Sequence, residues 1–387
     1  MTANVTVEKP DSTIVFPREN ASEGLSYELN WSLCGSGVVP QGKSFRNLKV
    51  AELAKLGGTS PESVPKAVPW TSALEQEVTA YLGSEKVTRY VQDSALGALL
   101  SNEVPVRIVS DSAAATLNFK TWLSTTKTIP LPQFQEAVTV LVAANFNSKG
   151  PIISYGPKSK TIIIAGTANM EPLLDFFPQA TAEAFLALNV LPLWGSLVGG
   201  NFFASKGFDA NATIKHGTAF SAAGFCRLFM GSIANGKVKD EYKAFPNSLP
   251  LPKSVVFFAN DATAVIPPAA KLTAAQAAFY YVAACSPPGV ANFSAAARLV
   301  TDLGAKSEVY LVNRGAFATA AAADAAALAL PGKKGSAGAL GLEVVSVEGE
   351  TKAPAAGAAA TTAKALQTAV ETRCKGLDAI IAAGPKI

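Results

Sequence analysis

The chain has 387 residues, of which 49% are hydrophobic and 16% are charged, and its formal net charge at pH 7 is +4. This length is enough for two domains or for one large α/β unit with a substantial core. So small a net charge, without any run of Lys and Arg, argues against nucleic acid as a partner.

Residues 1–24 are polar and rich in turn-forming residues, which predicts an extended N-terminal arm. The arm contains no apolar run, so we expect no secretory signal. In residues 27–33 the large apolar side chains Tyr27, Leu29 and Trp31 alternate with smaller or polar ones, and this pattern is typical of a strand.

The next segment satisfies the Walker A pattern GxxxxGKS with Gly37, Gly42, Lys43 and Ser44. In a working phosphate loop, backbone N–H groups cradle the phosphates, the Lys reaches the terminal phosphates and the Ser binds Mg²⁺. A predicted strand precedes the pattern, and a predicted helix over residues 48–56 follows it. We favour a coincidental match in a loop, and these four residues are the one candidate for nucleotide binding.

The middle of the chain alternates between helical and strand patterns. Residues 70–82 and 113–123 predict helices, whereas residues 106–111 and 161–166 predict apolar strands. The uncharged span 184–205 contains prolines and glycines that a membrane helix would be expected to lack, so we predict a buried strand with loops there and no membrane partner. The alternation as a whole indicates the α/β class.

The clearest pattern lies between residues 253 and 313. Residues 255–258, VVFF, predict a buried strand that stops at Asn260 and Asp261. Thr273 is placed to cap a helix, which the sequence SPPG ends. After a linker, residues 309–312 predict a second buried strand that stops at Asn313. Two apolar strands around a helix indicate an α/β core.

The tail is rich in alanine. Its composition predicts a helix over residues 318–330, a short strand over 342–347 and a flexible linker over 351–362. A last helix, residues 363–382, has an apolar face made of Leu366, Val370, Leu377, Ile380 and Ile381. Such a helix docks onto its own core or onto a partner. We favour a partner, and we therefore expect removal of residues 351–387 to leave the melting temperature of the core unchanged.

Three segments of this chain resemble the ATP-dependent phosphoenolpyruvate carboxykinases. Residues 261–268 read DATAVIPP where that family has DAFGVLPP, residues 271–273 read KLT at the family's helix start, and residues 310–315 read YLVNRG where the family has YLVNTG. Weaker matches begin near Asn47 and are poorest between residues 197 and 251. The resemblance implies an N-terminal α/β domain followed by a nucleotide domain. It does not imply activity, because activity depends on the site and not on the fold.

The groups with which a carboxykinase handles ATP, metal and oxaloacetate have no counterpart in this sequence. The family's phosphate loop GLSGTGKTT and its acidic DDEH run are missing, and Trp194 stands where the family has a metal-binding His. Residues 166–172, GTANMEP, lack the family's metal-binding Lys, and its substrate arginines align with Thr59 and Tyr242. Each of these groups stabilises charge in the transition state, so their joint loss implies loss of catalysis.

No metal site and no cofactor are expected. His216 is the only histidine, so a metal site with two histidine ligands is excluded, and we interpret His216 as an ordinary residue. Arg107 and Asp111 are as well explained by a structural ion pair as by a functional one. No CxxC pair occurs, and reduced thiols are expected at all four cysteines: Cys34, Cys226, Cys285 and Cys374.

We therefore predict an α/β, carboxykinase-like pseudoenzyme. Its layout is an arm (1–24), a carboxykinase-like N-terminal domain (25–201), a truncated nucleotide-domain remnant (202–315), a helix and strand extension (316–350) and a linker with a C-terminal helix (351–387). The expected role is structural, with protein partners in a larger cytoplasmic assembly, for which a microtubule-based structure such as the ciliary axoneme is one setting. Two alternatives stay open: a carboxykinase-type or nucleotide-binding protein with residual activity, and a small-molecule sensor that kept its pocket.

Overall fold

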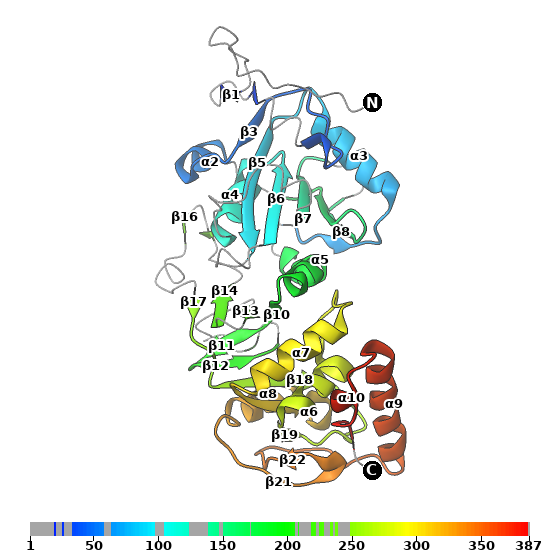
Figure 1. The fold of residues 1–387 in the computed structure, drawn as a ribbon. Coiled ribbons are helices and arrows are strands. Elements are labelled where there is room, and N and C mark those ends of the chain that lie inside the picture. Colours follow the sequence, from blue (N-terminus) through cyan, green and yellow to red (C-terminus); the bar gives the residue numbers. More distant parts are fainter. Residues whose placement is uncertain are drawn as a thin grey trace, which may run out of the picture. The chain divides into compact units, whose positions relative to one another are not determined.

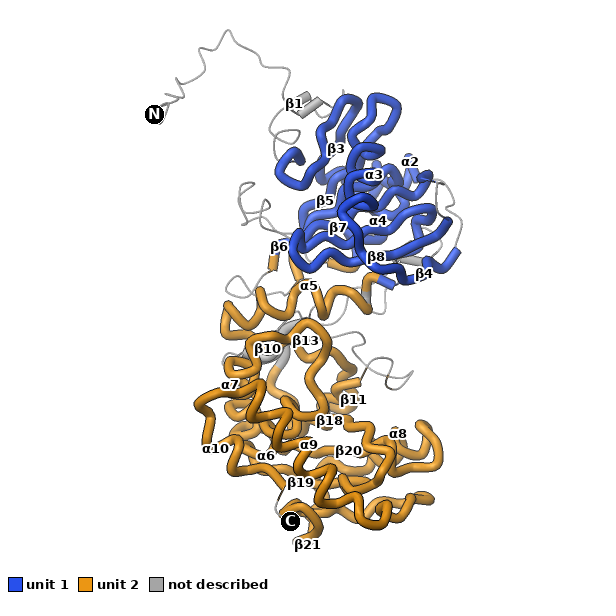
Figure 2. Tube along the Cα trace, turned by 90° about the vertical axis from the view of Figure 1, so that its right-hand side faces the viewer, with its two compact units in different colours: residues 1–94, 105–121, 125–172 blue, residues 95–104, 122–124, 173–387 orange. Residues whose placement is uncertain are grey.

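The computed structural model shows a mixed α/β protein with two compact units (Figure 2). Unit 1 comprises Met1–Ser94, Pro105–Thr121 and Thr125–Pro172, and unit 2 comprises Ala95–Val104, Trp122–Ser124 and Leu173–Ile387. The main division therefore falls at residue 172, not at the predicted position 201. The structure describes residues 19–20, 25–26, 33–57, 63–96, 104–123, 138–146, 150–170, 172–205, 208, 218–221, 224–227, 233–234, 237–238 and 248–385.

Unit 1 is built on a seven-stranded sheet with the order β3-β5-β6-β7-β9-β8-β4 (Figure 1). The strand β8 runs antiparallel to β9, whereas β3 with β5, β6 with β7, and β7 with β9 are parallel. In chain order the strands are β3 (Ser44–Arg46), β4 (Lys66–Ala67), β5 (Arg89–Leu96), β6 (Val104–Ser110), β7 (Val138–Ala143), β8 (Ile152–Gly156) and β9 (Thr161–Ala165). The strands predicted over residues 106–111 and 161–166 are confirmed as β6 and β9.

The helix α3 (Ser72–Gly83) covers one face of this sheet. Its Thr71 cap accepts a hydrogen bond from the Leu74 N–H, and its apolar face packs on Val109 and Leu141 of the sheet. Alternate strand residues such as Ile108 are also fully buried, so the opposite face is covered too. Among its described residues, unit 1 also contains the helices α2 (Val50–Leu56) and α4 (Ala113–Trp122). The predicted helices over residues 70–82 and 113–123 are thus confirmed.

Unit 2 contains a second seven-stranded sheet, with the order β11-β12-β18-β20-β19-β22-β21. The strands β12, β18 and β20 are parallel, and β19, on the other side of β20, is antiparallel to it. The bounds are β11 (Ser196–Val198), β12 (Asn201–Phe203), β18 (Ser254–Ala259), β19 (Ala269–Leu272), β20 (Glu308–Asn313), β21 (Ser336–Ala337) and β22 (Glu343–Val344). The two strands predicted between residues 253 and 313 are confirmed as β18 and β20.

The helix that Thr273 was expected to cap is α6 (Ala274–Tyr280). Thr273 and Gln276 form a reciprocal capping box, and the helix continues as the π-helical turn η3 (Tyr281–Cys285), which ends at Ser286. The prediction of a linker after this helix is wrong, because the chain forms the helix α7 (Phe293–Gly304) there. Asn292 caps α7 by accepting a hydrogen bond from the Ala295 N–H.

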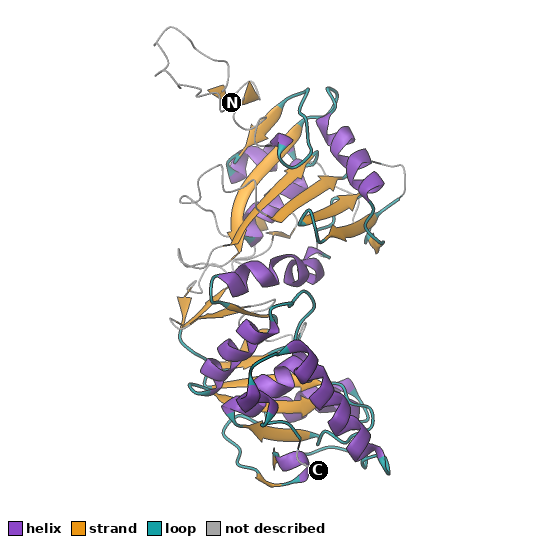
Figure 3. Cartoon of the chain, turned by 45° about the vertical axis from the view of Figure 1, so that its right-hand side comes forward, coloured by secondary structure: helices purple, strands orange, loops and turns teal. Residues whose placement is uncertain are grey.

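Helices cover both faces of the unit 2 sheet (Figure 3). On one face α6, η3 and α7 pack on inward side chains that include Phe257, Leu311 and Leu272. On the other face α8 (Ala320–Leu328) packs through Ala323 and Ala327 on Tyr310 and its neighbours. Because α8 and β22 complete this unit, the segment predicted as a separate extension, residues 316–350, belongs to the same core.

The C-terminal helix covers the unit's own core, which corrects the expectation that a partner covers it. The chain forms α9 (Ala358–Arg373) and the short α10 (Asp378–Ile381), separated by a turn in which Gly376 has a φ of +77°. Val370, Cys374 and Ile380 are buried in the same cluster as α6. Arg373 Nη1 also donates to the Val282 carbonyl oxygen at 2.7 Å.

The other elements include a four-stranded antiparallel sheet in unit 2, ordered β10-β13-β14-β17. No described helix is long and apolar enough to cross a membrane, and the span 184–205 forms the end of α5 and the strands β10 to β12. The predicted strand over residues 27–33 lies outside the described residues except for Leu33. The remaining bounds are β1 (Glu19–Asn20), β2 (Leu25–Ser26), α5 (Leu173–Ala187), β10 (Leu191–Leu193), β13 (Thr218–Ser221), β14 (Gly224–Arg227), β15 (Ile233–Ala234), β16 (Lys237–Val238), β17 (Ser248–Leu249), η4 (Arg314–Ala316) and η5 (Ala339–Gly341).

Candidate functional site

Asp261 begins the segment DATAVIPP, which resembles the carboxykinase sequence. Its carboxylate forms hydrogen bonds within its own loop. Asp261 follows β18, and its Oδ1 accepts hydrogen bonds from the Thr263 N–H at 3.0 Å and from Thr263 Oγ1 at 2.5 Å. Its Oδ2 accepts from the Ile266 N–H at 2.9 Å. Both carboxylate oxygens therefore close the loop that leads to β19, as in other short Asp-centred turns.

Asn313 ties the ends of the two parallel strands β18 and β20 together. Its Oδ1 accepts from the N–H groups of Asp261, at 2.8 Å, and Gly315, at 3.1 Å. Its Nδ2 donates to the carbonyl oxygens of Ile266, at 2.7 Å, and Asp261, at 3.1 Å. A Cβ on Gly315 would lie 2.4 Å from the Asp261 oxygen, so only glycine fits beside this tie. Asp261, Asn313 and Gly315, which lie in the segments that resemble the carboxykinases, thus form one structural hydrogen-bond network.

Replacing Asn313 with alanine is expected to lower the free energy of unfolding by about 2–4 kcal/mol, because four backbone groups, two of them in fully buried hydrogen bonds, lose their partner at once. Asn292→Ala is the matched control. It removes the cap of α7, which is worth about 1 kcal/mol. Chemical denaturation of both variants measures the difference, and equal losses would contradict a special role for Asn313.

The Walker A-like residues lie in a geometry that differs from a phosphate loop. Ser44 begins the strand β3, is 2% exposed, and its Oγ accepts a hydrogen bond from Arg89 Nε at 2.9 Å. A phosphate loop places its Lys-Ser pair at the start of a helix, whereas here α2 begins only at Val50. Lys43 is exposed, and a Cβ on Gly42 would lie 2.5 Å from the Glu85 carbonyl oxygen. Gly37, Gly42 and Lys43 therefore precede the strand β3, which Ser44 begins, and the four residues do not form a phosphate loop.

Arg107 pairs with Asp93 and not with Asp111, which corrects the ion pair considered from the sequence. Arg107 is fully buried, and its Nε and Nη2 lie 2.5 and 3.1 Å from the two carboxylate oxygens of Asp93. Arg46 Nε adds a third contact, at 2.7 Å, to the same carboxylate. Asp111 instead accepts hydrogen bonds from Tyr81 and from the segment that follows β7. This buried charge cluster holds the edge of the unit 1 sheet.

The other residues considered from the sequence either form hydrogen bonds within the fold or lie outside the described residues. Thr167 is buried, and its Oγ1 donates to the Ser63 carbonyl oxygen and accepts from the Asn169 N–H. His216, Thr59 and Tyr242 lie outside the described residues. Among the residues that the structure describes, no group of three or more His, Cys, Asp or Glu side chains could hold a metal ion.

A cavity of about 440 Å³ lies within unit 2, between α5, the ends of β10 and β12, and the turn η3. Leu193 and Phe257 give it apolar walls, and the Phe257 ring is tilted against that of Tyr281 at a centroid distance of 5.6 Å. The lining residues come from five separate stretches of the chain: Asp175, Pro178, Gln179, Pro192, Leu193, Trp194, Gly195, Ala204, Ser205, Phe257, Tyr281, Cys285, Pro287 and Pro288. Sequence reasoning named Trp194 only as a replacement for a metal-binding His and did not place it in a pocket.

Burial disfavours the ionised forms of two polar groups of this cavity, the Cys285 thiol and the Tyr281 hydroxyl. Burial raises the pKa of the Cys285 thiol to about 12, and it also raises the pKa of the Tyr281 hydroxyl, with the nearby Cys285 adding to the effect. A thiol with so high a pKa is a poor nucleophile at neutral pH. The cavity is therefore suited to binding and not to thiol chemistry.

Cys285 is expected to react with iodoacetamide at pH 8 about fifty times more slowly in the folded protein than in the denatured chain. The raised pKa lowers its thiolate fraction by about a thousandfold, and the greater nucleophilicity of a more basic thiolate restores part of that loss. The rate should rise tenfold for each pH unit and level off only near pH 12. Peptide mapping of the alkylated cysteines gives both rates, and a plateau near pH 9 would contradict the burial of this thiol.

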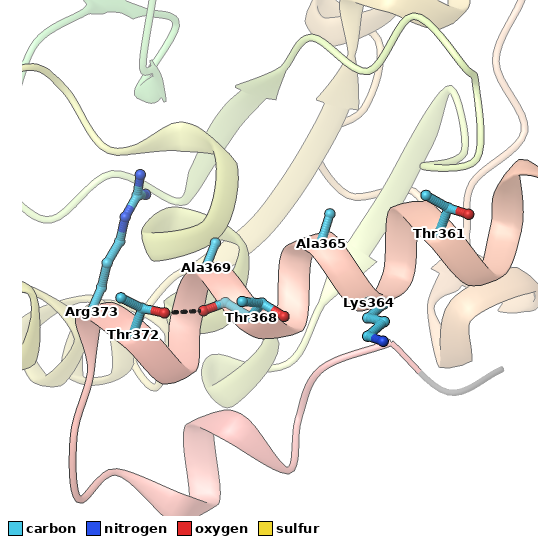
Figure 4. Close-up of a pocket in the computed structure, with 7 residues that line it drawn as sticks. All are labelled: Thr361, Lys364, Ala365, Thr368, Ala369, Thr372 and Arg373. Atoms are coloured by element: carbon cyan, nitrogen blue, oxygen red, sulfur yellow. Dashed lines mark hydrogen bonds between the residues drawn. The ribbon is translucent and has the colours of Figure 1, made fainter.

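A larger hollow, about 600 Å³, lies along α9 but is lined by that helix alone (Figure 4). Its residues are small or exposed side chains on successive turns: Thr361, Lys364, Ala365, Thr368, Ala369, Thr372 and Arg373. A cavity with one wall does not enclose a ligand, so the smaller cavity in unit 2 is the better candidate site. No family model matches this chain, and no curated protein sequence matches it either.

Proposed function

We propose that this protein is a non-catalytic relative of the ATP-dependent phosphoenolpyruvate carboxykinases and serves as a structural or interaction component of a larger protein assembly. The observation that carries the proposal is the use of the resembling residues. The Asn313 amide bonds the backbone of Asp261, at the end of β18, and of Ile266, and the Asp261 carboxylate accepts from the Ile266 N–H in its own loop. A carboxylate engaged in this way supports the fold and is not presented to a metal or phosphate.

The replacement of charged groups supports the same proposal. Trp194 aligns with the family's metal-binding His, and an indole has no basic lone pair to offer a metal. In the structure Trp194 lines a cavity with Leu193 and Phe257, where a metal and phosphates would be poorly solvated. The resembling core would then act as a building block whose surface binds other proteins.

Two assays on the purified full chain test the catalytic half of this proposal. With oxaloacetate, ATP and Mn²⁺, we expect no phosphoenolpyruvate, and turnover within a hundredfold of the usual ~10 s⁻¹ would overturn the proposal. Millimolar Mg-ATP should leave the melting temperature unchanged. A bound nucleotide at a hundredfold excess over its dissociation constant would add about 2.7 kcal/mol. A shift that disappears in Lys43→Ala would favour nucleotide binding at Gly37–Ser44.

Isolation of the tagged chain from its native cells tests the assembly half. We expect it to elute in a large complex with stoichiometric protein partners that withstand physiological salt. Microtubule components among those partners would favour a cytoskeletal setting, including the ciliary axoneme. Elution as a single chain without partners would contradict the structural role.

A further inference from the structure

Lysines follow one edge of the unit 2 sheet, the edge at which the parallel strands β18 and β20 begin. The Glu308 N–H, at the start of β20, donates to the carbonyl oxygen of Lys253, just before β18, at 3.1 Å. Lys306 lies shortly before β20, and Lys271 lies near the end of β19, which runs antiparallel and therefore ends at the same edge. Because neighbouring strands are about 4.8 Å apart, these three lysines lie at successive steps along the edge.

The loop over residues 330–335 adds two more lysines to this edge. Its sequence is LPGKKG, and the Tyr310 hydroxyl oxygen lies 3.1 Å both from the Lys333 carbonyl oxygen and from the Glu308 carboxylate. These contacts hold Lys333 and its neighbour Lys334 beside the start of β20. We call the five residues the lysine edge: Lys253, Lys271, Lys306, Lys333 and Lys334.

Positive charge is in excess at the lysine edge. The Glu308 carboxylate pairs with Lys271 Nζ at 2.6 Å, and the Glu343 carboxylate accepts a hydrogen bond from the Gly335 N–H at 2.8 Å. Even with Asp302 of α7 counted, the lysines outnumber the carboxylates. The other four lysines form no ion pair with any described residue: Lys253, Lys306 and Lys334, which are exposed, and Lys333, which is half-buried. Such a local excess attracts an anionic partner.

The surroundings of these lysines favour an acidic protein segment over a nucleic acid. Glu308 and Glu343 would repel a continuous phosphate backbone, whereas a peptide can place uncharged residues opposite them. The ring of Tyr310, beneath the edge, is fully buried and cannot stack on a base. An extended chain advances about 3.3 Å per residue, so carboxylates on successive or alternate residues can each reach a lysine of this row.

We propose that the lysine edge binds an extended segment of a protein partner that is rich in Glu and Asp. This inference rests on the proposed role as an interaction component and names the class of partner. The contact is formed by exposed charges, so its affinity depends strongly on salt. The test uses the purified full chain without native partners, which separates it from the test of assembly.

Fluorescence anisotropy of fluorescein-labelled decaglutamate measures the binding. We expect saturable binding that weakens about tenfold between about 50 and 200 mM salt. Lys306→Glu with Lys334→Glu should weaken it at least about tenfold, because two charges of the lysine edge are reversed. Lys364→Glu with Lys375→Glu is the matched control. It changes the net charge equally at exposed positions on and after α9, and it should weaken binding less than about threefold. Equal weakening by the two pairs, or no saturable binding, would overturn the proposal.

Two further arms test the charge balance and the class of partner. Glu308→Gln removes the carboxylate that competes for Lys271 and should tighten decaglutamate binding about two- to threefold, whereas Glu371→Gln on α9 should leave it unchanged. Equal effects of these two variants would contradict binding at the lysine edge. A labelled ten-nucleotide oligothymidylate should bind more weakly than decaglutamate, and equal or tighter binding of the oligonucleotide would overturn the choice of a protein partner.

The outcome is also distinguishable from failure of the structural role. A chain that enters a large native complex but does not bind decaglutamate would contradict this inference alone. A chain that binds decaglutamate at the lysine edge but elutes from cells without partners would support the site and contradict the structural role.

Discussion

Replacement of Asp93 with alanine is expected to lower the free energy of unfolding by about 3–5 kcal/mol, because it removes the carboxylate that pairs with the buried Arg107 guanidinium. Arg107 is fully buried and Asp93 is 3% exposed, so water cannot replace the lost carboxylate without opening the sheet. Urea denaturation followed by circular dichroism measures the loss.

Two variants control for this effect. Arg46→Ala removes the other arginine from the same carboxylate, but Arg46 is one-third exposed, so we expect a loss of about 1 kcal/mol or less. The double replacement of Asp93 by leucine and Arg107 by methionine removes both buried charges and should recover most of the lost stability. A double variant as unstable as Asp93→Ala would show that the loss comes from packing and not from the broken ion pair.

Removal of residues 358–387 is expected to lower the melting temperature of unit 2 by about 10–20 °C. The deletion strips the core of four buried residues of α9, α10 and the turn between them and exposes α6 beneath them, a loss of about 5 kcal/mol after the ordering entropy of the segment is regained. Differential scanning calorimetry of the full and shortened chains gives the shift. The buried residues are Ala363, Val370, Cys374 and Ile380.

A pair of point variants on α9 separates docking from a general effect of truncation. Val370→Asp places a charge at a fully buried position and should destabilise unit 2 by about 3 kcal/mol or more. Thr368→Asp adds the same charge two residues away on the exposed side of the helix, where we expect a change within about 0.5 kcal/mol. Equal stability of the two variants would mean that α9 is not docked in solution.

The strands and helices that the sequence predicts well have apolar runs with clear ends. The residues VVFF stop at Asn260, and Thr273 with Gln276 marks the start of α6, so hydrophobicity and capping agree. Helix α7 was missed although Asn292 and the spacing of Ala296, Val300 and Leu303 carry the same signals. The alanine-rich stretch that forms α7 comes soon after Pro287, Pro288 and Gly289, and these turn-forming residues obscured its helical signals.

The strand β19 was missed for a different reason. Its residues AAKL have weak strand propensity, and the strand forms because it fills the place between β20 and β22 in the sheet. Tertiary pairing of this kind leaves little trace in the local sequence. The docking of α9 is similar, because an amphipathic pattern identifies an apolar face without saying which surface covers it.

The candidate site was the hardest part to predict. The sequence pattern drew attention to Asp261 and to Gly37–Ser44, but these residues hold the fold together. The cavity is assembled from the stretches around Trp194, Phe257 and Tyr281 and from two other stretches of the chain, none of which forms a motif. A pocket made of apolar side chains from distant stretches becomes visible only when the chain is folded.

The strand order of unit 2 also determines when that unit can fold during protein synthesis. The sheet of unit 1 is complete once Ala165 has left the ribosome, whereas β18 gains its neighbour β20 only at residue 308, and the helix α8, which covers the other face, ends at Leu328. At the usual 5–20 residues per second, the apolar strand beginning at Ser254 therefore stays incompletely covered for about 4–15 s. Unit 1 would fold first, and the nascent residues 254–259 are where a ribosome-associated chaperone should bind.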